Sequence, residues 1–188
     1  MDKTIFTSQG DFLKVKSAET TPYFYAERKG TDSVAFILID NTRKDKYGVV
    51  NERKPPMDER SSELAFIETA FGGSNDMIDD ENYFDMTDDA TIIHFKKLVK
   101  IEAREESGFD VELDRIDYIS KEYVSTQMNQ WAYMFTVDVT DIEQGDKDPQ
   151  NAEEAMGSIR WKSLKEVQKM NDWKAKTIIF NMIWFFQI

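Results

Sequence analysis

The stretch that decides the fold is Ile101-Glu102-Ala103-Arg104-Glu105-Glu106-Ser107-Gly108-Phe109, in which three glutamates precede a glycine. Residues three and four apart on a helix are neighbours, so Glu102 is predicted to face both Glu105 and Glu106. Like charges at that spacing destabilise a helix, and a stop at Gly108 sets the carboxylates against the negative end of the helix dipole. Because a divalent cation with hard oxygen preferences would turn this repulsion into coordination, we interpret the cluster as a metal site.

An acidic turn of this kind also fits a solvated helix face, since most charge runs lie at the surface. The metal interpretation gains support because the segment resembles the second half of the Nudix box. The family pattern is a glycine, five residues, a glutamate, seven residues and then R-E-U-x-E-E-x-G-U, where U is a bulky aliphatic residue. The matching positions are Glu102, Glu105, Glu106 and Gly108. Phe109 is an apolar stand-in for the last aliphatic residue, and Ile101 replaces the family arginine.

A second resemblance lies upstream, at Glu68-Thr69-Ala70-Phe71-Gly72-Gly73. It is similar to the E-x-P-A-G that leads into the box in the ADP-ribose and ADP-sugar pyrophosphatase branch, which makes Gly72 the box-opening glycine. The separation of Gly72 and Ile101 is more than twice that of the usual box, which implies an acidic insertion at about residues 74–88. We interpret the insertion as either a lid over the pocket or an inert surface excursion. Ile93 stands where the first box glutamate is expected.

The resemblance also implies which groups hold the cofactor, Mg²⁺ or Mn²⁺. Glu102 and Glu106 would be metal ligands and Glu105 a third ligand or an outer partner, with Glu102 and Glu105 also serving in catalysis. Phe71 would add its backbone carbonyl, as the residue before the box glycine does in similar ADP-sugar enzymes. Ile101 cannot make the charge-assisted hydrogen bonds with which the family arginine orients the glutamates, so the sequence also fits a slow or degenerate site.

The catalytic base is expected outside the box. In the ADP-ribose branch it sits on a downstream loop, and Glu153 and Glu154 lie in the corresponding polar stretch, residues 141–157. A carboxylate on a mobile loop would approach the reacting water only when substrate closes the site. A capping or surface role is the alternative interpretation of each residue.

Two residues near the start of the box are candidates for binding substrate. Arg53, followed by Glu68, resembles the arginine of the V-x-Q-Y-R that precedes E-x-P-A-G in the ADP-ribose branch. An arginine fork grips a phosphate or pairs with a box glutamate. A surface arginine beside Lys54 is the alternative.

Composition narrows the class of protein. With 188 residues the chain is predicted to form one ordinary domain with a sizeable core. The net charge of −12 argues against binding to a nucleic acid duplex, because affinity for a polyanion comes from clustered Lys and Arg. The chain has no cysteine, no signal-like segment at its start and no long apolar run, so we expect a cytoplasmic protein without a membrane span.

The pattern of apolar and polar residues predicts a mixed α/β chain. Strands are expected at residues 12–16, 23–26, 34–39, 46–53, 64–68, 116–123, 131–139 and near 159. Helices are expected at residues 87–108, 163–169 and 173–186, and a polar, substrate-facing loop at residues 125–130. The resemblance implies the Nudix-type α/β/α sandwich with a mixed β-sheet. Residues 1–30 would form an N-terminal strand segment that supports a dimer, and residues 31–188 the Nudix domain.

The function implied by these resemblances is Mg²⁺-dependent hydrolysis of the pyrophosphate in a nucleoside diphosphate linked to another moiety, as in ADP-ribose or an ADP-sugar. Hydrolysis of a pyrophosphate requires charge neutralisation on two phosphoryl groups and a water placed in line, which divalent cations provide. The expected partners are a small phosphorylated nucleotide substrate and a second copy of the chain. A Nudix-fold protein that senses a nucleotide without turning it over is the alternative.

Overall fold

The computed structural model describes residues 3–8, 13–19, 23–28, 32–53, 66–75, 88–150 and 152–186. The strands are β1 (Lys3–Thr7), β2 (Leu13–Ser17), β3 (Phe24–Arg28), β4 (Ser33–Ile39), β5 (Tyr47–Arg53), β6 (Phe66–Thr69), β7 (Ile116–Ser125), β8 (Met128–Asp138) and β9 (Ser158–Lys162). The helices are α2 (Asp88–Glu102), α3 (Ala152–Met156), α4 (Leu164–Lys169) and α5 (Trp173–Phe186), with the short turns η4 (Ala103–Ser107) and η5 (Leu113–Arg115). The expected insertion falls almost wholly at 76–87, outside the described residues.

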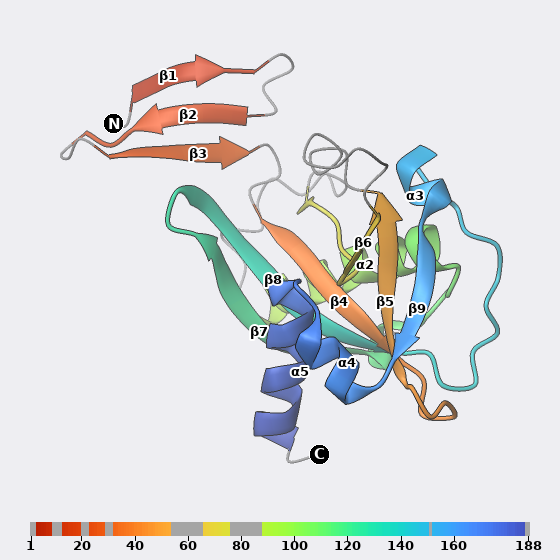
Figure 1. Ribbon diagram of the computed structural model, residues 1–188. Helices are drawn as coiled ribbons and strands as arrows, with labels where there is room; N and C mark the ends of the chain where they lie inside the picture. Colours follow the sequence, from red (N-terminus) through yellow and green to blue (C-terminus); the bar gives the residue numbers. More distant parts are fainter. Residues whose placement is uncertain are drawn as a thin grey trace.

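All nine strands belong to one mixed sheet (Figure 1). Its order is β1-β2-β3-β8-β4-β5-β6, with β7 paired to β8 and β9 paired to β5. At the centre, β4 and β8 run parallel, while β7 and β8 form an antiparallel hairpin. Strand β4 is buried along almost its whole length, as its continuous apolar run predicts.

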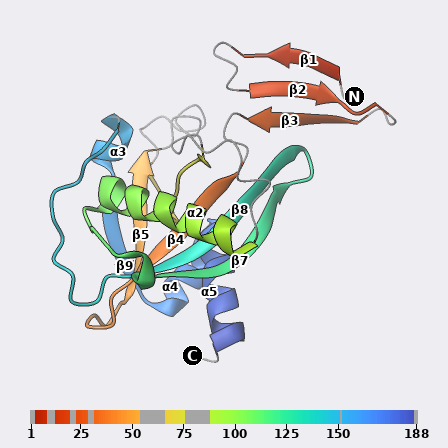
Figure 2. The same ribbon diagram turned by 180° about the vertical axis from the view of Figure 1, so that it is seen from behind.

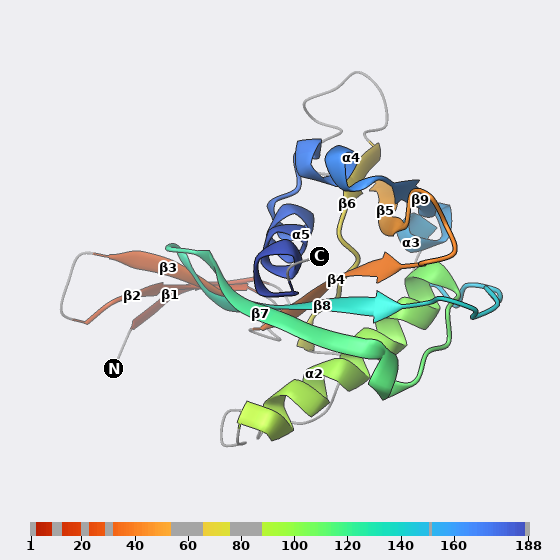
Figure 3. The ribbon, with the colours of Figure 1, turned by 90° about the horizontal axis from the view of Figure 1, so that it is seen from below.

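Helices cover both faces of the central sheet, which confirms the expected sandwich. Helix α2 lies on one face (Figure 2), and α4 and α5 lie on the other, as the view from below shows (Figure 3). Side chains alternate along a strand, so β4 supplies both cores. Phe36 packs in the core under α2, together with Phe95 of that helix, whereas Ile37 packs in the core under α5, together with Ile178. Among the described residues, no helix is long and apolar enough to cross a membrane.

The first three strands extend beyond the body of the domain (Figure 1). Strand β1 was not expected from the sequence, and all five of its residues are exposed. Strand β3 reaches the central sheet through one parallel pairing, Ala26 with Met128. The assignment of residues 1–30 to a separate N-terminal segment stays a prediction.

Two stretches expected to be irregular contain regular elements. The polar loop predicted at residues 125–130 is wrong, because only Thr126 and Gln127 form the turn between β7 and β8. Ser125 pairs across the hairpin with Met128, and Gln130 is buried in β8. Alternate side chains of a strand lie on the same face, so polar residues can line one face of β8. A run of polar residues in the sequence does not reveal this arrangement. Helix α3 likewise lies inside the polar stretch 141–157.

Candidate metal centre

The acidic segment begins where α2 changes its winding. After Glu102 the helix continues through η4 as a π-helical turn and stops at Gly108, whose φ is 79°. The N–H of Gly108 donates to the carbonyl of Arg104 at 3.0 Å. A side chain at Gly108 would also place its Cβ 2.4 Å from the carbonyl oxygen of Gly145, so only glycine fits. The predicted helix stop is confirmed, and single π turns of this kind are frequent at functional sites.

The three glutamates do not share one environment, contrary to the expectation of a single helix face. Glu102 and Glu106 are 5% and 7% exposed, whereas Glu105 is half-buried and accepts a hydrogen bond from Nε2 of Gln150 at 2.9 Å. The π turn is wider than an α turn, so spacing on an ideal α-helix does not describe this segment. Glu102 and Glu106 therefore form the buried pair of the site.

The glycine pair before the box lies directly against this buried pair. The N–H of Gly72 donates to Oε2 of Glu106 at 3.2 Å. A Cβ built on Gly73 would lie 1.7 Å from Oε1 of Glu102, and one on Gly72 would lie 2.2 Å from the carbonyl oxygen of Val34. The absence of side chains at both positions thus allows the loop to contact the two carboxylates and β4 at once.

Phe71, the predicted carbonyl ligand, holds this loop in place. Its ring stacks on that of Phe36 with centroids 5.3 Å apart, and it is almost fully buried. Its N–H donates to the carbonyl of Phe36 at 2.9 Å, and its carbonyl accepts from the N–H of Phe36 at 2.9 Å. A carbonyl oxygen has two lone pairs, so this hydrogen bond leaves one lone pair that a metal can use. The metal role of Phe71 stays a prediction.

Other carboxylates surround Glu106. Burial raises the pKa of Glu106 well above its ordinary value, and the negative charges of Glu102, Glu52 and Glu154 raise it further. Glu52 comes from β5, where its Oε1 accepts from the hydroxyl of Thr69 at 3.1 Å. Glu52 was not predicted from the sequence, although strand alternation from buried Val50 identifies residue 52 as facing the same way.

Glu154, a predicted base, is brought to the box by α3. Its Oε2 accepts from the backbone N–H of Gln150 at 2.8 Å, and the side chain of Gln150 donates to Glu105. Burial raises the pKa of Glu105, and the charge of Glu154 adds to this shift. Glu153 lies in the same helix, but its side chain is outside the described part of the structure. Its role stays a prediction.

The two candidate substrate-binding residues are placed elsewhere. Glu68 pairs with Lys162, with Oε1 and Nζ 2.8 Å apart, and lines an open groove beside α4. Asn51 lies opposite Glu68 in the ladder between β5 and β6. Because neighbours on a strand point to opposite faces, Arg53 and Asn51 lie on the face away from Glu52. Strand alternation therefore places Arg53 and Glu68 on the face away from Glu52, and their roles in substrate binding stay predictions.

The residues present fit a hard divalent cation. In the described part of the chain, no three His, Cys, Asp or Glu side chains converge on one point closely enough to hold a metal as they stand. The charged side chains that raise the pKa of Glu106 are nevertheless all carboxylates, the donors that suit Mg²⁺ and Mn²⁺. Their mutual repulsion, seen in the raised pKa of Glu106, is the electrostatic state that a divalent cation would relieve.

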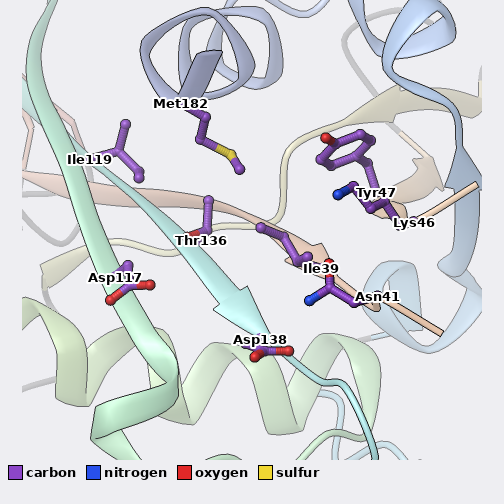
Figure 4. Close-up of a pocket in the computed structure, with 9 residues that line it drawn as sticks. All are labelled: Ile39, Asn41, Lys46, Tyr47, Asp117, Ile119, Thr136, Asp138 and Met182. Atoms are coloured by element: carbon purple, nitrogen blue, oxygen red, sulfur yellow. The ribbon is translucent and has the colours of Figure 1, made fainter. Parts of the chain in front are cut away.

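A partly open cavity of about 210 Å³ lies on the opposite face of the sheet, between the sheet and α5 (Figure 4). It is lined by polar groups such as Asp117, Asp138 and Asn41, with Ile119 and Met182 on its apolar side. Thr136, which also lines it, alternates on β8 with Phe135, a core residue under α2. The cavity is therefore separate from the glutamate pair.

The chain is similar to known proteins in its structure and not in its sequence. No protein-family model matches the sequence, and no curated protein matches it. Among solved structures, a crystal structure of an ADP compounds hydrolase matches 100% of this chain and 92% of its own, with a TM-score of 0.65 and 13% identity. The chain has a Nudix-like fold. At this identity the likeness concerns the fold alone, so any activity has to be argued from the residues of this chain.

Proposed function

We propose that this chain is a Mg²⁺- or Mn²⁺-dependent hydrolase that cleaves the pyrophosphate of a nucleoside diphosphate linked to another group, with ADP-ribose and ADP-sugars as the best candidates. The observation that carries the proposal is the buried pair Glu102 and Glu106, held against the Gly72-Gly73 loop in a Nudix-like fold. A solvated acidic helix face, the alternative interpretation, would leave these carboxylates exposed.

The chemistry divides among the residues already located. A bound divalent cation supplies charge neutralisation on the two phosphoryl groups and an acidified water. Glu102 and Glu106 would hold the cation, with Glu52 and Glu105 beside them, and the carbonyl of Phe71 is a further candidate donor. Glu154 takes the proton from the attacking water, because α3 sets its charge close to both Glu105 and Glu106.

A binding protein without turnover is the second candidate, favoured by one observation. Ile101, in place of the box arginine, is 38% exposed, and Ile93 is also exposed, so neither residue adds a charged group to the centre. A sensor would bind the nucleotide and the metal but release no product. Turnover therefore decides between the two candidates.

We also propose that the chain is a homodimer formed through its N-terminal strands. Ile5, Phe6 and Phe24 are each more than half exposed on the three N-terminal strands of the sheet, which add none of their described residues to either core cluster. A small sheet with exposed apolar side chains gains stability when a partner covers them. A second copy of the chain is the partner expected from the sequence.

The test is a screen of nucleotide sugars, dinucleotides and nucleoside triphosphates with Mg²⁺ or Mn²⁺. For the nucleotide sugars and dinucleotides, a phosphatase that acts only on terminal phosphates is added and the released phosphate is measured. For the triphosphates, released pyrophosphate is measured without the phosphatase. Wild-type chain should release phosphate from nucleoside diphosphate derivatives, whereas Glu106→Gln should not. Tight binding of the same compounds without release by the wild type would favour the sensor.

A further inference from the structure

Lys147 lies in the segment between β8 and α3, which passes the end of the box helix, and no role was predicted for it from the sequence. This segment is fixed at its start, where Nε2 of Gln144 donates to the carbonyl of Ser107 at 2.8 Å and the N–H of Gly145 donates to the carbonyl of Gly108 at 2.9 Å. It is fixed again near its end, where the side chain of Gln150 donates a hydrogen bond to the carboxylate of Glu105. The expected mobile loop is thus held to the metal centre at two places.

Between these places, the side chain of Lys147 turns to α3. Its Nζ donates to the carbonyl of Glu154 at 3.0 Å and to the carbonyl of Gly157 at 2.9 Å. The N–H of Gly157 itself donates to the carbonyl of Glu154 at 3.0 Å, so the ammonium closes the end of the helix. A cation there also complements the negative end of a helix, although α3 is too short for this to be a large effect.

The electrostatic surroundings of Lys147 are those of the metal centre. Its half-buried position lowers the pKa of the ammonium, and the negative charges of Glu106, Glu154 and Glu52 oppose that shift. Two of its three donors are used on carbonyl oxygens, which leaves its charge fixed in position and unneutralised by them. Arg104, the cation within the box itself, is exposed and acts on Glu105.

We propose that Lys147 is a positioning residue of the metal centre: it ties α3 in place and sets one fixed positive charge against the carboxylates, so that Glu154 is held beside Glu106. Only the expected effect of Lys147 on turnover rests on the proposed function. The expected effects of Lys147 on metal binding and on the stability of the metal-free chain can be measured without any substrate.

The charge of Lys147 has a measurable consequence, because it opposes a second cation at the same carboxylates. Removing the charge should tighten metal binding while it slows turnover. If Lys147 only stiffened the loop, its removal would weaken metal binding, because a loosened site binds metal less tightly. Lys147→Met removes charge and hydrogen bonds together, whereas Lys147→Gln keeps a donor for the carbonyls and removes only the charge. Lys147→Arg keeps the charge.

The experiment is calorimetric titration of the full chain with Mn²⁺ at low ionic strength. Lys147→Met and Lys147→Gln should each lower the Mn²⁺ dissociation constant on the order of tenfold, an effect that salt should reduce. Lys147→Arg should stay within about twofold of the wild type. Lys96→Met is the matched control, because Lys96 of α2 is also half-buried and donates to a backbone carbonyl, that of Leu113. It should leave the dissociation constant unchanged.

Two further readings on the same variants complete the test. In metal-free chain, Lys147→Gln should lower the melting temperature, and Mn²⁺ should raise it by more than in the wild type. On an active substrate, Lys147→Met should lower kcat more than it raises KM, and Lys147→Arg should restore much of kcat. Unchanged or weaker Mn²⁺ binding in Lys147→Gln would overturn the proposal, as would equal effects of Lys147→Met and Lys96→Met. A chain that binds Mn²⁺ as expected but hydrolyses nothing would refute the proposed function and leave the role of Lys147 standing.

Discussion

Gly73→Ala provides a sharp structural test of the metal centre. The added Cβ would lie 1.7 Å from Oε1 and 2.2 Å from Cδ of Glu102, where ordinary contact begins at 3.4 Å. The carboxylate therefore has to retreat by about 1.7 Å, which is the difference 3.4 − 1.7. The clash is with the far end of a flexible side chain, and no left-handed backbone angle is required at Gly73. The substitution should displace a metal ligand while the fold survives.

The expected loss can be estimated from this displacement. A misplacement of about 1 Å at a reacting centre costs on the order of 100-fold in rate, which corresponds to about 2.7 kcal/mol of transition-state stabilisation. Gly73→Ala should therefore lower kcat/KM on an active substrate by about that factor and weaken Mn²⁺ binding in calorimetry. The melting temperature should fall by only a few degrees.

Two glycine substitutions serve as comparisons. Gly72→Ala would place Cβ 2.2 Å from the backbone oxygen of Val34, so it should destabilise the fold by about 1–3 kcal/mol, as overpacking does. Gly145→Ala meets only the oxygen of Gly108, at 3.5 Å, and should be tolerated. Wild-type Mn²⁺ affinity and rate in Gly73→Ala would refute the placement of Glu102 in the centre.

Three other predictions concern the glutamates and the assembly. Glu102→Gln and Glu106→Gln should each abolish turnover and weaken Mn²⁺ binding with circular dichroism unchanged, because charge is lost at nearly constant volume; saturating Mg²⁺ should not restore the rate. Glu106 has a raised pKa in the folded chain, so its ionisation opposes folding: metal-free chain should lose this part of its stability as pH rises above the ordinary glutamate range, about 4.3, toward the raised pKa, and Glu106→Gln should remove that loss in thermal melts. Light scattering should give a dimer at micromolar concentration and a monomer after deletion of residues 1–30, and a full-length monomer would exclude the dimer.

Much of the fold followed from local pattern. The apolar run in β4 predicted a strand buried on both faces, and Gly108 marked the end of the box helix. Helix α5 was predicted with its observed bounds, Trp173–Phe186. These features depend on residues close in sequence, so periodicity and turn chemistry are sufficient to find them.

The parts of the site that escaped prediction depend on contacts distant in sequence. The pairing of β5 with β6 brings Glu52 near Glu106. Strand alternation then places Glu52, and neither Arg53 nor Glu68, on the face toward Glu106. Lys147 belongs to a polar stretch without periodicity, whose position is set by hydrogen bonds to the end of the box helix. The π turn that separates Glu105 from Glu102 and Glu106 also has no signature in the spacing of the glutamates.

The central claim is that these carboxylates hold a metal for cleavage of a phosphoanhydride bond. The most direct measurement is mass spectrometry of the products after incubation of the chain with ADP-ribose in heavy-oxygen water, with Mg²⁺ and with a chelator. The account predicts AMP and ribose 5-phosphate, with heavy oxygen in one of the two phosphates, only when Mg²⁺ is present. Products formed equally in the chelator, or unreacted ADP-ribose and ADP-sugars with both Mg²⁺ and Mn²⁺, would contradict it.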